Sequence, residues 1–245
     1  MGEIIAVLSG KGGTGVTTVT AALGNALSSR GQKTLLLDLN FQKCDLPVLY
    51  GAEDRISWHL LDVIEGNCRI IQAMIPCRKD ESLYLLPGST ARELRLIPVS
   101  SFVKLTGMFR SSFDFILIDT PSGPSEGCSY ALAASDSVIA LTDSTLLSRR
   151  NTKRLLQLPE FDSVRKSMIL NRFDRKLLRD GGLPLPEDVA QEIGIPLLGI
   201  VPESEEILLS SDRGAVAEDP KKASGKCFDR IAGRLLGEEI PISLK

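Results

Sequence analysis

The sequence predicts an α/β protein with a doubly wound, mainly parallel sheet that carries helices on both faces. Short apolar runs alternate along the chain with longer helical patterns, which is the signature of repeated βαβ units. Several of the short runs are continuous in Val, Ile and Leu, as expected for strands that are covered on both sides. The 245 residues, 43% of them hydrophobic, are enough for one sizeable core, and we expect a single domain over residues 1–245.

Seven apolar runs have the length and composition of strands. In chain order they are Ile4–Leu8, Lys33–Asp38, Leu83–Pro87, Phe113–Asp119, Ser137–Thr142, Ser167–Asn171 and Leu197–Val201. A glycine-rich turn follows the first run and leads into a helical pattern through Ala21, Leu23 and Leu27. Helical patterns fill most of the other gaps, which completes the alternation.

The clearest helix is the last one, because its apolar residues recur at i, i+3, i+4, i+7 and i+8. These residues are Phe228, Ile231, Ala232, Leu235 and Leu236. The stripe carries few cations, so we expect it to face a core and not a membrane. Further back, Arg175–Asp188 is rich in charge, Gly and Pro, which predicts a surface loop before a helix that starts near Pro186.

The turn after the first strand has the pattern of a phosphate-binding P-loop with one substitution. Residues 10–18 read GKGGTGVTT and match G-x-x-x-x-G-K-(S/T), except that Val16 stands where the motif has lysine. Glycines let backbone N–H groups approach phosphates, and the following helix dipole favours anions. The predicted cradle is Gly12, Gly13, Thr14, Gly15, Val16, Thr17 and Thr18. The alternative is a tight turn that only joins a strand to a helix.

Two aspartates stand where phosphate chemistry needs them. Asp38 and Asp119 each end a predicted parallel strand, at the edge where open α/β sheets bind ligands. Asp119 closes an apolar strand as in a Walker B element, which holds Mg²⁺ together with the P-loop hydroxyl, here Thr17. We therefore expect Mg²⁺ near Thr17, Asp38 and Asp119. The alternative is that these aspartates only cap the turns that follow them.

With these residues in place, the sequence resembles the MinD/ParA family of deviant Walker A ATPases. That family has a P-loop K-G-G-x-G-K-(S/T)-T with an additional signature lysine, which Lys11 matches. Asp38–Asn40 resembles its switch I and Asp119–Gly123 its switch II, while Asn171-Arg172 and Val201–Glu203 resemble its adenine-contacting segments. The resemblance is co-linear over nearly the whole chain.

Within the family, the septum-positioning MinD branch is the most similar. The stretches that support it are Asp62–Gly66, Leu83–Pro87 and Gly233–Glu239. Pilus-assembly localisation factors of the CpaE/TadZ kind, which often lack the same P-loop lysine, are the second possibility.

The resemblance implies a nucleotide-dependent homodimer that binds ATP or ADP with Mg²⁺ and works as a positioning or assembly regulator with protein partners. It implies that Lys11 reaches the phosphates bound by the other subunit and that Asp38 and Asn40 lie at the hydrolytic centre. It also implies adenine contacts. Those residues are Asn171, Arg172, Pro202 and Glu203.

Three departures from the family pattern limit what it implies. Val16 removes a cation from the P-loop, which should weaken nucleotide binding about 10- to 150-fold without abolishing it. Asn40 replaces the second switch I aspartate, so we expect weak or absent hydrolysis, against the alternatives of a slow ATPase that uses Lys11 and a scaffold without nucleotide. The chain also lacks the basic amphipathic helix that ends MinD proteins, so we expect no membrane anchor of its own.

The remaining features concern partners and location. Arg149, Arg150, Lys153 and Arg154 fall on one face of a predicted helix. Such a face is usually only solvated, but it could contact DNA, as ParA relatives do, or an acidic partner. A net charge of −2 gives no overall attraction to nucleic acid or membranes. Without a signal peptide pattern, we expect a cytoplasmic protein that reaches a membrane only through a partner.

Overall fold

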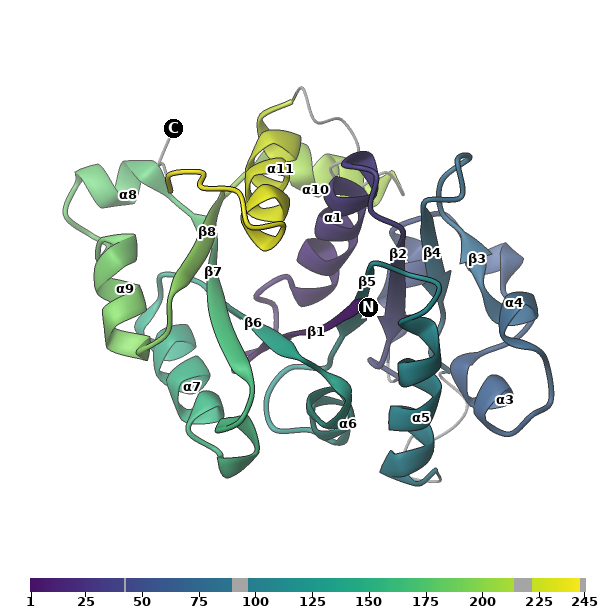
Figure 1. Cartoon of the computed structure of the whole chain (residues 1–245). Helices are drawn as coiled ribbons and strands as arrows, with labels where there is room; N and C mark the ends of the chain where they lie inside the picture. Colours follow the sequence, from purple (N-terminus) through teal and green to yellow (C-terminus); the bar gives the residue numbers. More distant parts are fainter. Residues whose placement is uncertain (42, 90–96, 214–221, 243–245) are drawn as a thin grey trace.

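The computed structural model describes residues 1–41, 43–89, 97–213 and 222–242 and confirms the α/β fold class (Figure 1). Eight strands form one sheet in the order β3-β4-β2-β5-β1-β6-β7-β8, and every neighbouring pair is parallel except β3 with β4. The strands are β1 Glu3–Ser9, β2 Thr34–Asp38, β3 Ile75–Pro76, β4 Leu83–Leu86, β5 Phe115–Asp119, β6 Ser137–Thr142, β7 Arg165–Phe173 and β8 Leu197–Pro202. All seven predicted strands are therefore present.

Helices cover both faces of this sheet, as Figure 1 shows, with α1 and α11 on one side and α5, α6 and α7 on the other. The α-helices are α1 Val16–Ser29, α2 Asp45–Val48, α3 Leu60–Ile64, α4 Ile70–Ala73, α5 Val99–Phe109, α6 Glu126–Ala134, α7 Leu146–Leu156, α8 Arg175–Arg179, α9 Pro186–Ile193, α10 Glu205–Asp212 and α11 Ala223–Leu235. Short 3-10 turns occupy Glu53–Arg55 and Pro159–Phe161. The layers are those of a doubly wound sheet.

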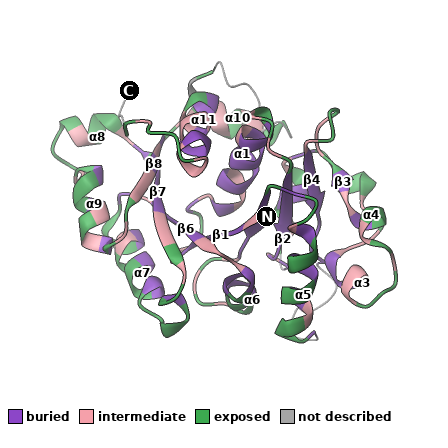
Figure 2. Cartoon of the chain, viewed as in Figure 1, coloured by how far each residue is buried: buried purple, intermediate pink, exposed green. Residues whose placement is uncertain are grey.

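The sheet is buried on both faces because successive side chains of a strand point to opposite sides. In β1, Ile4, Ala6 and Leu8 join the core beneath α5, α6 and α7, whereas Ile5 and Val7 join the core beneath α1 and α11. Figure 2 shows the same burial along the central strands. This two-sided burial explains why the strands read as continuous apolar runs.

The C-terminal helix α11 packs as its periodicity predicts. Phe228, Ile231 and Ala232 are all at most 1% exposed and join the core that α1 also covers. Arg30, at the end of α1, makes a bidentate ion pair with Asp229 of α11. The apolar stripe is thus used inside the protein.

The structure corrects the sequence prediction in two places. The expected loop over Arg175–Asp188 contains the short helix α8, which the Asp174 side chain caps by accepting hydrogen bonds from the backbone N–H groups of Lys176 and Leu177. No residue of α8 is buried, so the sequence has no helical repeat of apolar residues there that would have predicted the helix. The edge strand β3 has only two residues, which is too short for any periodicity to register.

The chain connectivity gathers several strand ends at one place. From β1 the chain passes through α1 to β2 on one side of the sheet, while β6, β7 and β8 extend the other side. Ligands of open α/β sheets bind at the carboxyl ends of the strands where the strand order reverses in this way. Here the glycine-rich turn, both strand-end aspartates and the ends of β7 and β8 share that edge.

Candidate nucleotide-binding site

The glycine-rich turn between β1 and α1 has the backbone conformation of a phosphate cradle. Gly13 and Gly15 adopt φ angles of 77° and 92°, in the left-handed region that glycine occupies without strain, and Gly15 is the N-cap of α1. The carbonyl oxygen of Lys11 accepts hydrogen bonds from Ser9 Oγ at 2.8 Å and Thr14 Oγ1 at 3.3 Å. The loop is therefore held from within, and the amino-terminal end of α1 opens onto it.

Gly10 is required for a different reason, which is close packing. A Cβ atom at Gly10 would lie 2.3 Å from backbone atoms of Asn151 and Thr152 in α7. Gly12, by contrast, has only the Ser122 hydroxyl near its missing Cβ, at 3.5 Å. The start of the loop is thus fixed against α7, while its exposed tip is free to meet a ligand.

Val16 faces inward at the position where the motif has lysine. It is the first residue of α1, is 9% exposed and belongs to the buried cluster that contains Ile5, Val7 and Val19. Its side chain adds apolar packing to the core under α1 and offers no charge to the loop.

Lys11 is held inside its own subunit. Its Nζ lies 3.2 Å from Asp143 Oδ2, at the end of β6. The other carboxylate oxygen of Asp143 accepts hydrogen bonds from the backbone and hydroxyl of Thr145. Burial opposes ionisation, but the Thr145 hydrogen bonds and Lys11 together hold the pKa of Asp143 below its ordinary value. Asp143 carries no signal in the sequence, because a strand-end aspartate without a neighbouring motif has many uses.

Asp38 and Asp119 lie side by side, since β2 and β5 are neighbours and these two residues are partners in the parallel register. Both are completely buried. Thr17 Oγ1 donates a 2.8 Å hydrogen bond to Asp119 Oδ2, whereas Asp119 Oδ1 is buried without a hydrogen-bond partner. Asp38 Oδ1 accepts a 2.9 Å bond from the backbone N–H of Asn40, and Leu46 N lies 3.4 Å from Oδ2.

Burial dominates the electrostatics of this pair. It raises the pKa of Asp38 to about 7 and raises the pKa of Asp119 well above its ordinary value, and the charge of Asp38 adds to the second effect. Two buried carboxylates with one unpaired oxygen fit a divalent cation with oxygen ligands, such as Mg²⁺. In the part of the chain that the structure describes, no group of three or more His, Cys, Asp and Glu residues could hold a metal. A cation here would therefore share phosphate or water oxygens.

Asn40 lies two residues beyond Asp38 in the turn that leaves β2. Its carbonyl oxygen accepts hydrogen bonds from the backbone N–H groups of Lys43 and Cys44 at 3.0 and 2.8 Å. Cys44 has a φ angle of 50°, and burial together with the nearby carboxylates raises its pKa to about 12. The turn is thus built around Asn40, next to the buried aspartates.

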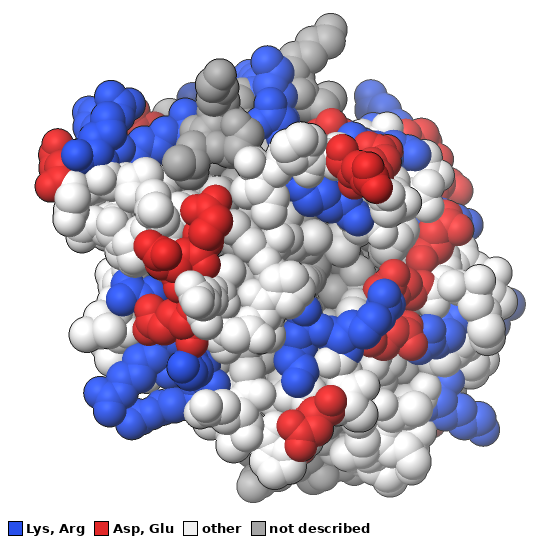
Figure 3. All heavy atoms as spheres, turned by 60° about the vertical axis from the view of Figure 1, so that its left-hand side comes forward, with Lys and Arg blue, Asp and Glu red and all other residues white. Residues whose placement is uncertain are grey.

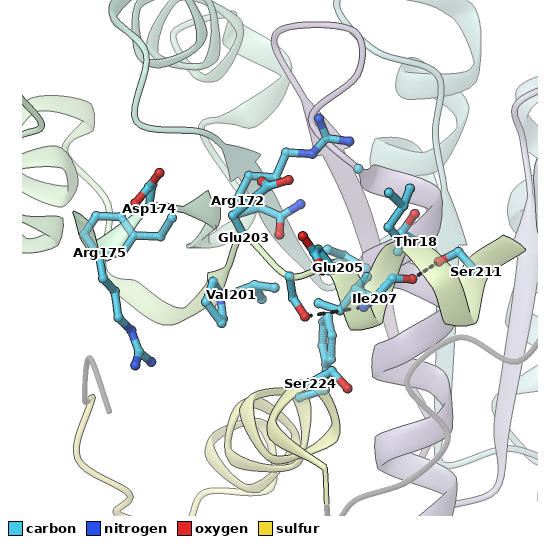
Figure 4. Close-up of a pocket in the computed structure, with 18 of the residues that line it drawn as sticks. Thr18, Arg172, Asp174, Arg175, Val201, Glu203, Glu205, Ile207, Ser211 and Ser224 are labelled. Carbon is cyan, nitrogen blue, oxygen red and sulfur yellow. Dashed lines mark hydrogen bonds between the residues drawn. The ribbon is translucent and has the colours of Figure 1, made fainter. Parts of the chain in front are cut away.

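A cleft of about 720 Å³ opens beside the start of α1, within the 300–1,000 Å³ range of small-ligand pockets (Figure 4). Of the predicted site residues, those that line it are Gly15, Thr18, Asn171, Arg172, Pro202 and Glu203. Asn171 Nδ2 donates a 2.6 Å hydrogen bond to the carbonyl oxygen of Thr14 and therefore ties β7 to the cradle. The structure brings the two predicted segments together with the phosphate loop.

Apart from Val201, which lies in a predicted adenine-contacting segment, the apolar lining residues had no signal in the sequence as ligand contacts, because they come from distant elements. The apolar ones are Val19, Phe173, Val201, Ile207, Leu208 and Phe228. They belong to α1, β7, β8, α10 and α11, so only the tertiary fold brings them together. An apolar wall next to a polar loop suits a ligand with a flat ring and a charged tail.

Comparison with known proteins agrees with this geometry. A profile of the AAA domain matches residues 2–171. The septum site-determining protein MinD of Bacillus subtilis is 32% identical over 248 residues, covering 100% of this chain and 92% of that protein. The chain belongs to the MinD/ParA family of deviant Walker A ATPases.

Solved MinD structures share the fold of this family member. The MinC:MinD cell division protein complex of Aquifex aeolicus contains a chain with 31% identity and a TM-score of 0.90, and the match covers 98% of both chains. MinD of Pyrococcus horikoshii, solved in complex with Mg-ADP, is 26% identical with a TM-score of 0.84, and the match covers 98% of this chain and 100% of that one.

The basic face predicted on α7 of this MinD/ParA-family chain is incomplete, which corrects the sequence prediction. The Arg149 side chain is 13% exposed, and its Nε lies 2.8 Å from Glu192 of α9. Arg149 also donates to the carbonyl oxygen of Ser144. Arg150, Lys153 and Arg154 are exposed, and DNA contact through them remains a prediction. Figure 3 shows separate groups of Lys and Arg with acidic side chains between them. Over the described ranges, no helix is long and apolar enough to cross a membrane.

Proposed function

We propose that this chain is a MinD-like adenine-nucleotide-binding protein that regulates the position of the division septum, or of a related assembly, through nucleotide-dependent dimerisation, with weak or absent ATP hydrolysis. The observation that carries the proposal is the continuity of one site. The phosphate cradle, the buried Asp38–Asp119 pair and the cleft at the ends of β7 and β8 meet at the start of α1. The whole of residues 1–245 would then act as one nucleotide-binding domain.

ATP or ADP would occupy this site with its phosphates on the cradle and its base in the cleft. Backbone N–H groups from Gly12 to Val16 and the hydroxyls of Thr17 and Thr18 would bind the phosphates, helped by the dipole of α1. Asn171, Pro202 and Glu203 would border the adenosine end, and Arg172 lines the same cleft as a further nucleotide contact. MinD of Pyrococcus horikoshii binds Mg-ADP, which supports the same ligand class here.

Mg²⁺ would be held by Thr17, Asp38 and Asp119. When bound, the ion would neutralise phosphate charge and the two buried carboxylates at once. Asp119 Oδ1 is buried without a hydrogen-bond partner, which supports a cation ligand at this position. The Thr17 hydroxyl already points at the same carboxylate.

Hydrolysis would be weak because two groups that promote it are changed. Removing one charge-stabilising donor typically costs about 10²–10³ in rate, and removing a residue that activates water costs about 10²–10⁴. The Val16 side chain supplies no donor, and Asn40 cannot act as a carboxylate base. Asp38 keeps its place, which leaves a slow ATPase that uses Lys11 as the alternative outcome.

Dimerisation would move Lys11 from its own subunit to the phosphates of the partner. This step would break the ion pair with Asp143, so the free subunit and the dimer would differ at this contact. A dimer formed only with ATP would be a switch that other proteins read. The MinC:MinD complex of Aquifex aeolicus supports a partner protein of the MinC kind.

Phosphate release and calorimetry with the purified chain test the proposal. We expect micromolar to high-micromolar binding of Mg-ADP and Mg-ATP, with phosphate release no faster than the uncatalysed background. The variant Val16→Lys/Asn40→Asp should gain measurable turnover, because it restores both groups. Turnover by the wild type that disappears in Lys11→Ala would show a slow ATPase instead. Absence of binding up to millimolar nucleotide would reject the proposed function.

A further inference from the structure

With Val16 at the lysine position, the phosphate cradle needs another source of positive charge. Lys11 is engaged by Asp143 in its own subunit. The cations that line the cleft are Arg172, Arg175 and Lys176. We infer that Arg172, at the end of β7, supplies the charge that the P-loop lacks and binds the phosphate chain of the nucleotide in the same subunit. This inference rests on the proposed nucleotide binding.

The backbone around Arg172 departs from the regular strand in a way that redirects its side chain. Leu170 pairs with Ile200 and Phe173 with Pro202, so two residues of β7, Asn171 and Arg172, lie opposite one residue of β8. An extra residue of this kind forms a bulge, which turns a side chain away from its regular direction and is common beside active sites. Arg172 is also one of three non-glycine residues with positive φ, at 54°, in the described part of the chain.

A non-glycine residue in the left-handed region is kept only where the surroundings hold it there. Asn171, which precedes Arg172, provides that hold. Its 2.6 Å hydrogen bond to the carbonyl oxygen of Thr14 fixes it against the cradle. A Cβ at Gly15 would lie 2.6 Å from the same Asn171 nitrogen, so the strand end and the loop are in close contact. The position of Arg172 is therefore set by the phosphate loop itself.

The direction of the side chain agrees with this role. Figure 4 shows the Arg172 guanidinium extending toward the amino-terminal end of α1, whereas the Arg175 side chain extends away from α1. Arg172 is exposed, and neither Glu203 nor Glu205 of the same cleft forms an ion pair with it. A guanidinium offers planar paired donors that match phosphate oxygens. Since no described residue forms an ion pair with Arg172, it can bind phosphate without first breaking one.

Nucleotide affinities of matched variants test this role. Losing one hydrogen bond to a charged group changes affinity about 10- to 150-fold, so Arg172→Ala should weaken Mg-ADP and Mg-ATP binding by that factor. Arg172→Lys should retain most of the affinity. Arg175→Ala, which removes a neighbouring cation of the same cleft, should change affinity less than about threefold, as expected for a weak, solvent-exposed charge.

Rescue distinguishes a phosphate contact from an adenine contact. In the Arg172→Ala background, Val16→Lys should recover at least about tenfold in Mg-ADP affinity, because it returns a cation to the phosphates. A contact to the base would not be rescued in this way. Displacement of a fluorescent ADP analogue by adenosine gives a second readout. The affinity for adenosine obtained in this way should be the same for the wild type and for Arg172→Ala.

The outcomes separate this inference from the proposed function. Wild-type binding of Mg-ADP together with unchanged binding by Arg172→Ala would overturn the inference and leave the proposed function intact. An equal loss of adenosine and ADP affinity would overturn it too, since it would place Arg172 on the base. Failure of the wild type to bind any nucleotide would reject both. Thermal melting of each variant confirms that a loss of binding is not a loss of fold.

Discussion

Replacing Asp38 by Asn should stabilise the metal-free protein at alkaline pH. The carboxyl group of Asp38 is fully buried, and burial raises its pKa from 3.8 to about 7. An acid whose pKa is higher in the folded protein than in the unfolded chain destabilises the folded state when the pH rises enough to ionise it. The wild type should therefore lose stability as pH rises from about 4 through about 7, while Asp38→Asn should not show this loss.

The size of the effect follows from the pKa change. A difference of about three pKa values, at about 1.4 kcal/mol each, corresponds to about 4 kcal/mol in the free energy of unfolding. The quantity to compare is the difference in the free energy of unfolding between wild type and Asp38→Asn, because titrating groups that do not interact with Asp38 cancel in it; Asp119 does interact, and the loss of the Asp38 charge acts on its pKa in the same direction. About 1.7 kcal/mol of the total is already lost at pH 5, so the gap should shift in favour of Asp38→Asn by about 2.6 kcal/mol between pH 5 and pH 8.

Urea unfolding with a chelator present at pH 5 and pH 8 measures this gap. Asp188→Asn, which removes an exposed aspartate of α9, is the matched control and should show no pH-dependent change. Adding Mg²⁺ at pH 8 should stabilise the wild type and leave Asp38→Asn nearly unchanged, since the cation needs the carboxylate. A wild type that becomes more stable than Asp38→Asn on going from pH 5 to pH 8 without metal would refute the reasoning.

Three further changes test other parts of the account. Gly10→Ala should lower the free energy of unfolding by about 1–3 kcal/mol, because its Cβ would overlap the α7 backbone. Gly12→Ala should lower it much less. Urea titrations compare the two variants, and equal effects would contradict the packing argument. Asp143→Asn should increase reductive methylation of Lys11 in the nucleotide-free protein, measured by mass spectrometry, and an unchanged rate would show that the ion pair is not populated. Arg149→Ala should lower the free energy of unfolding by about 1–2 kcal/mol, because it removes the partly buried ion pair with Glu192 of α9. An unchanged melting temperature would show that this ion pair does not stabilise the fold.

The strand pattern was predictable because each parallel strand buries both faces and so leaves a continuous apolar run. The seven predicted strands and the core-facing stripe of α11 follow directly from that rule. β3 and α8 escaped prediction for physical reasons. β3 pairs through only two residues, and α8 is capped by Asp174 and packs one partly buried apolar side chain, Leu178, against the core.

The site was predictable where local chemistry marks it. The P-loop spacing of residues 10–18 and the apolar strands that end in Asp38 and Asp119 mark these residues as candidates, and the structure brings them to one edge of the sheet. Asp143 and the apolar wall from α10 and α11 could not, because their roles exist only once the fold brings them to the cradle. The same holds for Arg149, whose partner Glu192 is 43 residues away in the chain.

The central claim is that this chain binds ATP without a P-loop lysine and responds by forming a dimer. Light scattering coupled to size-exclusion chromatography measures the molar mass of the protein directly, in three conditions: saturating Mg-ATP, saturating Mg-ADP and no nucleotide. We expect a mass about twice the 26.6 kDa of one chain with Mg-ATP, and the mass of one chain in the other two conditions and in Lys11→Ala with Mg-ATP. A mass that stays at one chain with saturating Mg-ATP, or a dimer that forms equally without nucleotide, would contradict the account.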